Sequence, residues 1–209
     1  MYLSRLRLDL NSFKTRYRLL NPYTLHQAIS RAFPDRSEGG PGRVLYRLDE
    51  DSGSSTAIIL VQSQKKPDWK KADYLSECFK EEPAVKIYQP KIIRGALYYF
   101  RLRANPTVKR GGKRYGLLRE EEQIKWLNRK ASDSGFTVLG CRTTSEGIEK
   151  SKKYEISEED AITLSFFAVK FDGVLRAENP DLIRAAIENG IGPGKGFGFG
   201  MLSIAPMKD

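Results

Sequence analysis

The chain has 209 residues and carries 36 Lys and Arg against 26 Asp and Glu, which gives a net charge of +10 and a pI near 9.6. This excess of positive charge indicates a polyanionic partner, nucleic acid before an anionic membrane, because the basic residues are scattered rather than gathered along an amphipathic helix. No apolar run is long enough to span a membrane. A single histidine excludes a His-rich metal centre, and the two cysteines, Cys78 and Cys141, lack the spacing of zinc ligands. So few and widely separated cysteines favour a cytoplasmic setting.

Periodic patterns in the first half predict the order strand, helix, strand, strand, helix, strand. Residues 2–10 alternate apolar and polar side chains, as a strand does. Asn21 is a suitable helix N-cap with Pro22 at the first helical position, so a helix is expected from there to Phe33. The remaining strands are expected at 44–48, 56–62 and 85–88, and a second helix at 68–80.

The same order is expected again in the second half. The predicted strands cover 96–104, 137–141, 162–171 and 201–204, with residues up to Arg176 as a hairpin partner of the third, and the helices cover 120–131 and 181–188. Each half then has the βαββαβ order of a ferredoxin-like unit. The predicted fold class is therefore α+β, with two tandem ferredoxin-like (RRM-like) domains at 1–88 and 94–209.

A glycine-rich stretch, GIGPGKGFGFG, occupies residues 190–200. It is not a Walker loop, because Lys195 is followed by Gly196 rather than Ser or Thr, and no frame fits the dinucleotide fingerprint. Two interpretations remain: a flexible turn before a terminal strand, or a backbone that lies close to a polyanion. In the second, Gly192, Gly194 and Gly196 would expose backbone N–H groups to phosphate and Lys195 would add charge.

The single histidine, His26, is the side chain whose ordinary pKa suits proton transfer near neutrality. Tyr23 precedes it by three residues, which places the two side chains about 60° apart around a helix. The alternative is that His26 is an ordinary surface or core residue of that helix.

Two groups of basic residues follow. In the first group, Arg101 and Arg103 lie on one face of an expected strand and are followed by Lys109, Arg110, Lys113 and Arg114. The second group falls in a polar segment between strands and contains Lys150, Lys152 and Lys153. A solvated face would explain either group alone, whereas the two groups and the glycine stretch together favour phosphate contacts. The acidic runs lack the spacing of a two-metal nuclease, so a nuclease of this kind would act without metal on RNA, whose 2′-OH is its own nucleophile.

Four stretches resemble the CasE-type CRISPR endoribonucleases: NPYTLHQ at 21–27, RLRANPTVKR at 101–110, GKRYGL at 112–117 and GIGPGKGFGFGMLSIAP at 190–206. The similarity runs in order along nearly the whole chain. It implies a metal-independent cut, without any cofactor, at the 3′ base of a CRISPR repeat RNA hairpin, and a place beside other subunits in the Cascade complex.

The resemblance also assigns residues. It implies that Tyr23 and His26 are catalytic and that Arg101, Arg103, Lys113, Arg114 and Lys195 contact RNA, whereas Lys150, Lys152 and Lys153 lie in a segment of variable length. We expect the 2′-OH to attack its own phosphate, with His26 as general acid and Tyr23 orienting or deprotonating the 2′-OH, or with these roles exchanged.

Two other functions fit the same sequence. A non-catalytic RNA-binding module would stack bases on exposed strand aromatics, for which Tyr98, Tyr99 and Phe100 are candidates. An anion-binding scaffold within an assembly is compatible with a nuclease that stays bound to its product.

Overall fold

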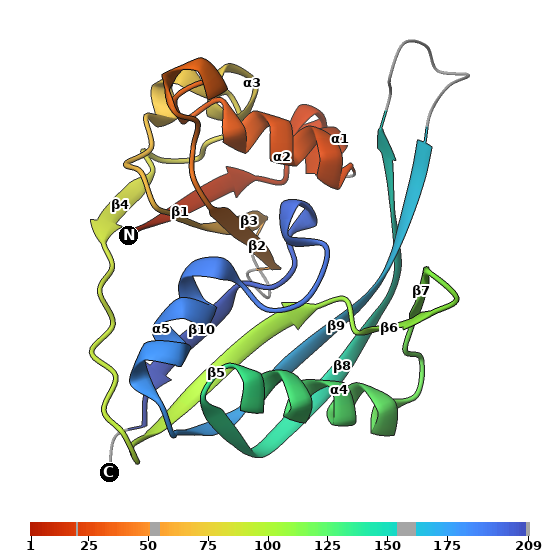
Figure 1. The fold of residues 1–209 in the computed structure, drawn as a ribbon. Coiled ribbons are helices and arrows are strands. Elements are labelled where there is room, and N and C mark those ends of the chain that lie inside the picture. Colours follow the sequence, from red (N-terminus) through yellow and green to blue (C-terminus); the bar gives the residue numbers. More distant parts are fainter. Residues whose placement is uncertain (20, 51–54, 154–161, 208–209) are drawn as a thin grey trace. The chain divides into compact units, whose positions relative to one another are not determined.

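The computed structural model of the chain contains two four-stranded sheets (Figure 1). It describes residues 1–19, 21–50, 55–153 and 162–207. The chain divides into two compact units. The first unit contains Met1–Gln89 with two short later segments, Lys150–Leu164 and Gly196–Gly198. The second unit contains Pro90–Glu149, Ser165–Lys195 and Phe199–Asp209. The division at 1–88 and 94–209 stays a prediction.

The sheet of the first unit has the order β2-β3-β1-β4. Its strands are β1 (Tyr2–Asp9), β2 (Val44–Glu50), β3 (Thr56–Ser63) and β4 (Ala84–Ile87). Its helices are α1 (Phe13–Leu19), α2 (Pro22–Ser30) and α3 (Asp73–Ser76), with the 3-10 turns η1 (Arg36–Glu38) and η2 (Trp69–Lys71). The first and third strands are central, as in a ferredoxin-like fold.

The core of the first unit forms between this sheet and its helices. Leu6 and Leu8 alternate inward along β1, and Ile59 lies opposite Leu6 in β3. Leu25 and Ile29, four residues apart on α2, bury the same helix face against these strands. This packing fixes α2 by its apolar stripe and leaves its other side for polar residues.

The second unit repeats the arrangement with the sheet order β10-β5-β9-β8. Its elements are β5 (Leu97–Ala104), β6 (Thr107–Arg110), β7 (Lys113–Gly116), α4 (Glu120–Asp133), β8 (Phe136–Lys153), β9 (Ile162–Ala177), α5 (Pro180–Asn189), the turn η3 (Lys195–Phe197) and β10 (Leu202–Pro206). The end of β8 from Lys150, the start of β9 to Leu164 and the last two residues of η3 belong to the first unit. The prediction of an α+β fold with tandem ferredoxin-like domains is confirmed.

The helix predicted at 68–80 is wrong. Only η2 and α3 are helical there, because the backbone after α3 bonds to β1 instead. The amide of Lys80 donates to the carbonyl of Arg7, and the amide of Asp9 donates to the carbonyl of Cys78. These bonds remove the groups that a continuing helix would need.

The hairpin predicted to return over residues up to Arg176 is also wrong, because β9 continues through them, with Arg176 opposite Leu97 of β5. Gly173 has no turn role within this strand. A Cβ atom there would lie 2.2 Å from the carbonyl oxygen of Gly140, so the glycine lets β8 approach closely.

Strand β8 is 18 residues long and runs beside β9 as one of two extended strands (Figure 1). Lys150, Lys152 and Lys153 therefore belong to a strand, not to a polar segment between strands as predicted. Lys150 is exposed, whereas the side chains of Lys152 and Lys153 lie outside the described part of the structure. Within the described ranges, no helix is long and apolar enough to cross a membrane.

Candidate functional site

The first turn of α2 is held by two side chains. The Oδ1 atom of Asn21 accepts a hydrogen bond from the amide of Tyr23 at 3.1 Å, as the predicted N-cap should. Ser151, a buried residue of β8 that belongs to the first unit, donates to the same Oδ1 atom at 3.1 Å, and its Oγ atom accepts from the Tyr23 amide at 3.1 Å. Asn21 and Ser151 therefore together hold the N-terminus of the helix that carries Tyr23 and His26.

The imidazole of His26 lies beside a buried tyrosine and a glycine of the first unit. The ring of Tyr46, on β2, is nearly parallel to it, with the centroids 6.5 Å apart and 18° between the planes. A Cβ atom built on Gly196 would lie 3.6 Å from the Nε2 atom of His26. Because a glycine occupies this position, no side chain of residue 196 fills the space next to Nε2.

Burial lowers the pKa of His26 from its ordinary value of 6.5. The Nδ1 atom is buried and has no hydrogen-bond partner among the described residues, so no described acceptor at that atom stabilises a charged imidazolium. Burial therefore favours the neutral imidazole, the form that accepts a proton.

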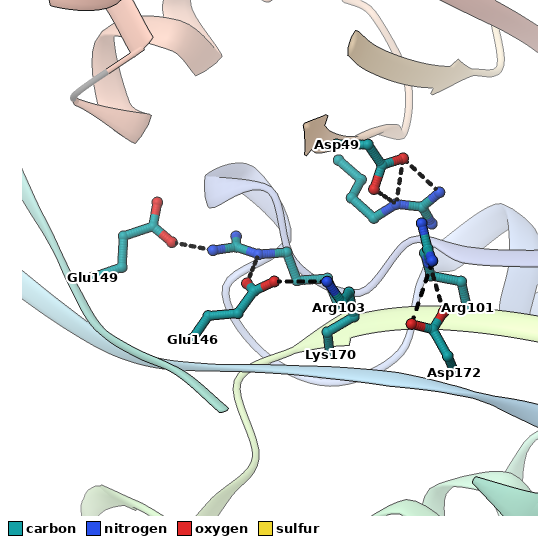
Figure 2. Close-up of polar contacts among 8 residues, drawn as sticks. Asp49, Arg101, Arg103, Glu146, Glu149, Lys170 and Asp172 are labelled. Carbon is teal, nitrogen blue, oxygen red and sulfur yellow. Dashed lines mark hydrogen bonds and ion pairs between the residues drawn. The ribbon is translucent and has the colours of Figure 1, made fainter. Parts of the chain in front are cut away.

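Arg101 and Arg103 share a face of β5, as predicted, and both are paired with carboxylates of the second unit (Figure 2). Arg101 contacts Asp172, which stands directly opposite it in the β5–β9 register, at 2.5 Å. Figure 2 shows the guanidinium of Arg103 between Glu146 and Glu149. Its nitrogen atoms lie 2.7 Å from a carboxylate oxygen of Glu146 and 2.6 Å from one of Glu149. Their predicted role in RNA contact stays a prediction, and these ion pairs give them a structural role as well.

A cavity of about 760 Å³ in the second unit gathers several of the predicted RNA-binding residues. Five cationic side chains line it: Lys109, Arg114, Arg129, Lys130 and Lys195. Gly192, Gly194 and Trp126 complete much of the wall, and no carboxylate is among the described lining residues. This charge and size suit phosphate groups of a polyanion.

Backbone conformation and tight packing require glycine at two positions of the 190–200 stretch, which could not be seen from the sequence. Gly192 and Gly194 have φ of 80° and 83°, a backbone conformation that favours glycine. A Cβ atom would lie 2.8 Å from the ring of Trp126 at Gly192, and 2.9 Å from the ring of Phe199 at Gly194. Contact of their backbone with phosphate stays a prediction.

The predicted residues thus fall into separate groups. Tyr23, His26 and Gly196 belong to the first unit; Arg114, Lys195 and two glycines line the cavity of the second; and Lys113, on β7, and Lys150 are exposed. Sequence reasoning missed Arg129 and Lys130, although their spacing of three and four residues from Trp126 predicts a shared face of α4. Tyr46 and Ser151 carry no local signal, because only tertiary packing brings them to α2.

The three aromatics proposed as a base-stacking platform are not all available. Tyr98 and Phe100 are 3% and 4% exposed, whereas Tyr99 is 52% exposed. Alternation along β5 sends the first two into the core of the second unit. A platform on this strand would therefore depend on Tyr99 alone among these three residues.

Tandem ferredoxin-like folds with a strongly basic cavity are typical of proteins that handle RNA. A family model described as a CRISPR associated protein matches residues 1–206, and the chain therefore belongs to the CRISPR-associated protein family. The resemblance to CasE-type proteins that the sequence motifs indicated is confirmed.

Two relatives and one solved structure are similar over nearly the whole chain. The CRISPR-associated endoribonuclease Cse3 of Thermus thermophilus is 33% identical over 214 residues, covering 99% of this chain and 100% of that protein. The CRISPR system Cascade subunit CasE of Escherichia coli is 28% identical over 199 residues, covering 88% and 92%. A structure of Cse3 bound to a 19-nucleotide RNA has a TM-score of 0.83 and 33% identity, covering 99% and 100%.

Proposed function

We propose that this protein is a metal-independent endoribonuclease that cuts CRISPR precursor RNA at the 3′ base of each repeat hairpin and stays bound to the product as a Cascade subunit. The observation that carries this proposal is the His26 imidazole, which lies next to Gly196 on the same helix as Tyr23 and whose pKa is lowered by burial. The named activity of the Thermus relative and the RNA-bound structure support it.

In the proposed reaction the 2′-OH upstream of the scissile bond attacks its own phosphate. A bond forms between O2′ and phosphorus, the bond from phosphorus to O5′ breaks, and the products carry a 2′,3′-cyclic phosphate and a 5′-OH. His26 accepts the proton of the 2′-OH and Tyr23 donates one to the leaving O5′. This exchanges the roles first expected, because burial favours the neutral imidazole.

The second unit supplies the affinity in this proposal. Arg114, Lys195 and the cations of α4 that line the cavity contact backbone phosphates, and the exposed Lys113 and Lys150 add charge. A paired RNA stem hides its base edges in a deep, narrow major groove, so it is bound mainly through its shape and backbone. The cytoplasmic location stays a prediction from the cysteine content.

We expect labelled repeat RNA to be cut once, at the 3′ base of the hairpin, by the purified protein in EDTA. Mass spectrometry of the fragments should find the cyclic phosphate and the 5′-OH. The matched control is the same hairpin with a single 2′-deoxy nucleotide upstream of the cut, which should bind equally and stay intact. Loss of cutting in EDTA, or cutting of the deoxy substrate, would rule out the mechanism.

The pH dependence of cleavage separates the two role assignments. With His26 as base, kcat/KM should be level near neutrality and decrease as the pH falls through a midpoint below 6.5, because burial lowers the pKa of His26. With His26 as acid, kcat/KM would instead decrease as the pH rises through that midpoint. Single-turnover rates at low RNA concentration, measured from about pH 8 down to well below the ordinary His pKa of about 6.5, would provide the profile.

A further inference from the structure

Tyr46 contacts three parts of the proposed active site, although nothing in the sequence marks it. Its side chain is buried, with 2% exposure. Its hydroxyl group lies 3.1 Å from the carbonyl oxygen of Pro22, in the first turn of α2, and 3.4 Å from the carbonyl oxygen of Gly196. Its ring lies beside the imidazole of His26, with 6.5 Å between centroids.

The backbone of Tyr46 is fixed by the sheet, where it lies opposite Val61 of β3. An aromatic side chain has only two torsions, so a buried tyrosine on a paired strand is a stiff spacer. Its single O–H can donate to one carbonyl at a time, and the shorter distance favours Pro22. The near-parallel ring limits rotation of the imidazole on the same side.

We propose that Tyr46 is a positioning residue for the cleavage reaction, an inference that rests on the proposed function. Its hydroxyl sets the spacing between the start of α2 and the backbone of Gly196, and its ring sets the plane of the His26 imidazole. The scissile phosphate would enter next to Nε2, where Gly196 lacks a side chain. The hydroxyl acts through His26 and Gly196 and does not touch the reacting atoms.

The test is Tyr46→Phe, which keeps the ring and removes one oxygen atom. Because small displacements of reacting groups are costly, we expect the single-turnover cleavage rate to fall about 10- to 100-fold. Affinity for the uncleavable 2′-deoxy hairpin should not change. The matched control is Tyr98→Phe, since Tyr98 is also buried and its hydroxyl bonds to the backbone of Lys91 and Ile93. That variant should cut at the wild-type rate.

A double-mutant cycle distinguishes positioning from general stability. If Tyr46 acts through His26, the rate effect of Tyr46→Phe should disappear in a His26→Ala background. An equal effect in both backgrounds, or a wild-type rate for Tyr46→Phe, would overturn the inference. Thermal melts of each variant check that the fold persists.

Tyr46→Leu provides a second variant, because it also removes the ring that lies beside the imidazole. The pH midpoint of its cleavage should move up towards 6.5, the ordinary value for His26, and an unmoved midpoint would contradict the role of the ring. Failure of the inference stays separate from failure of the proposed function. If the wild type does not cut repeat RNA at all, the proposed function is wrong; if it cuts and Tyr46→Phe cuts equally well, only the inference is wrong.

Discussion

His26→Ala is expected to slow cleavage of the repeat hairpin by about 10²- to 10⁴-fold, the usual contribution of a positioned acid or base. The substitution removes the proposed proton acceptor next to Gly196 and leaves the cations that line the cavity of the second unit in place. RNA affinity should therefore be unchanged while the rate collapses. Single-turnover cleavage and a filter-binding titration with the 2′-deoxy hairpin measure the two quantities separately.

The matched control is Gln27→Ala, one residue further along α2, where the side chain is exposed. It should cut and bind as the wild type does. Added imidazole should restore part of the rate of His26→Ala and none of the rate of Tyr23→Phe, because only the first variant lacks an imidazole. A normal rate for His26→Ala would show that another group accepts the proton.

The elements that the sequence predicted well are those whose signal is local. Alternation of apolar residues identified β1 and β5, and the Asn21–Pro22 pair located the start of α2. Helix α1 was missed because it has only seven residues, too few for a periodic pattern, and its aromatic pair, Phe13 and Tyr17, is 75% and 69% exposed. The β6–β7 hairpin was missed although Gly111 and Gly112 form the two-residue turn typical of such hairpins.

In the candidate site, too, only features with a local sequence signal could be predicted. Tyr23 and His26 could be found together because a helix brings residues three apart to one side. The contacts of this helix with Tyr46, Ser151 and Gly196 could not be predicted, since each of these residues reaches α2 from a distant part of the chain. Position in sequence carries no information about such contacts until the strand register is known.

Arg103 illustrates the limit of reading charge from sequence. Its basic character and its place beside Arg101 suggested RNA contact, but strand pairing brings Glu146 and Glu149 to its guanidinium. Burial lowers the pKa of Arg103, and the charges and hydrogen bonds of Glu149 and Glu146 outweigh that effect, so the net shift is upward. The guanidinium also lies over the ring of Phe199, 4.5 Å from its centroid.

We therefore expect Arg103→Ala to destabilise the protein strongly. The side chain is 15% exposed and its two partners 29% and 27%. The substitution leaves Glu149 without this cation and leaves Glu146 with Lys170, at 3.6 Å. Removing one partner of a fully buried pair costs about 3–5 kcal/mol, and partial solvation reduces this to about 2 kcal/mol of unfolding free energy. For a chain of this length that loss lowers Tm by about 4–8 °C.

Arg101→Ala is the matched control, because Arg101 is 42% exposed and its ion pair with Asp172 is largely solvated, so loss of that pair should cost at most about 1 kcal/mol. A triple variant, Arg103→Gln with Glu146→Gln and Glu149→Gln, removes the three charges together. It leaves no repulsion between the two carboxylates and should recover most of the lost Tm. RNA affinity of that triple variant then separates the two roles of Arg103. Wild-type affinity with restored stability assigns Arg103 to the fold of the second unit, whereas weak binding at restored stability assigns it to the RNA. An unchanged Tm for Arg103→Ala would contradict the structural role, because the ion pairs would then add no stability beyond that from hydration of the separate carboxylates.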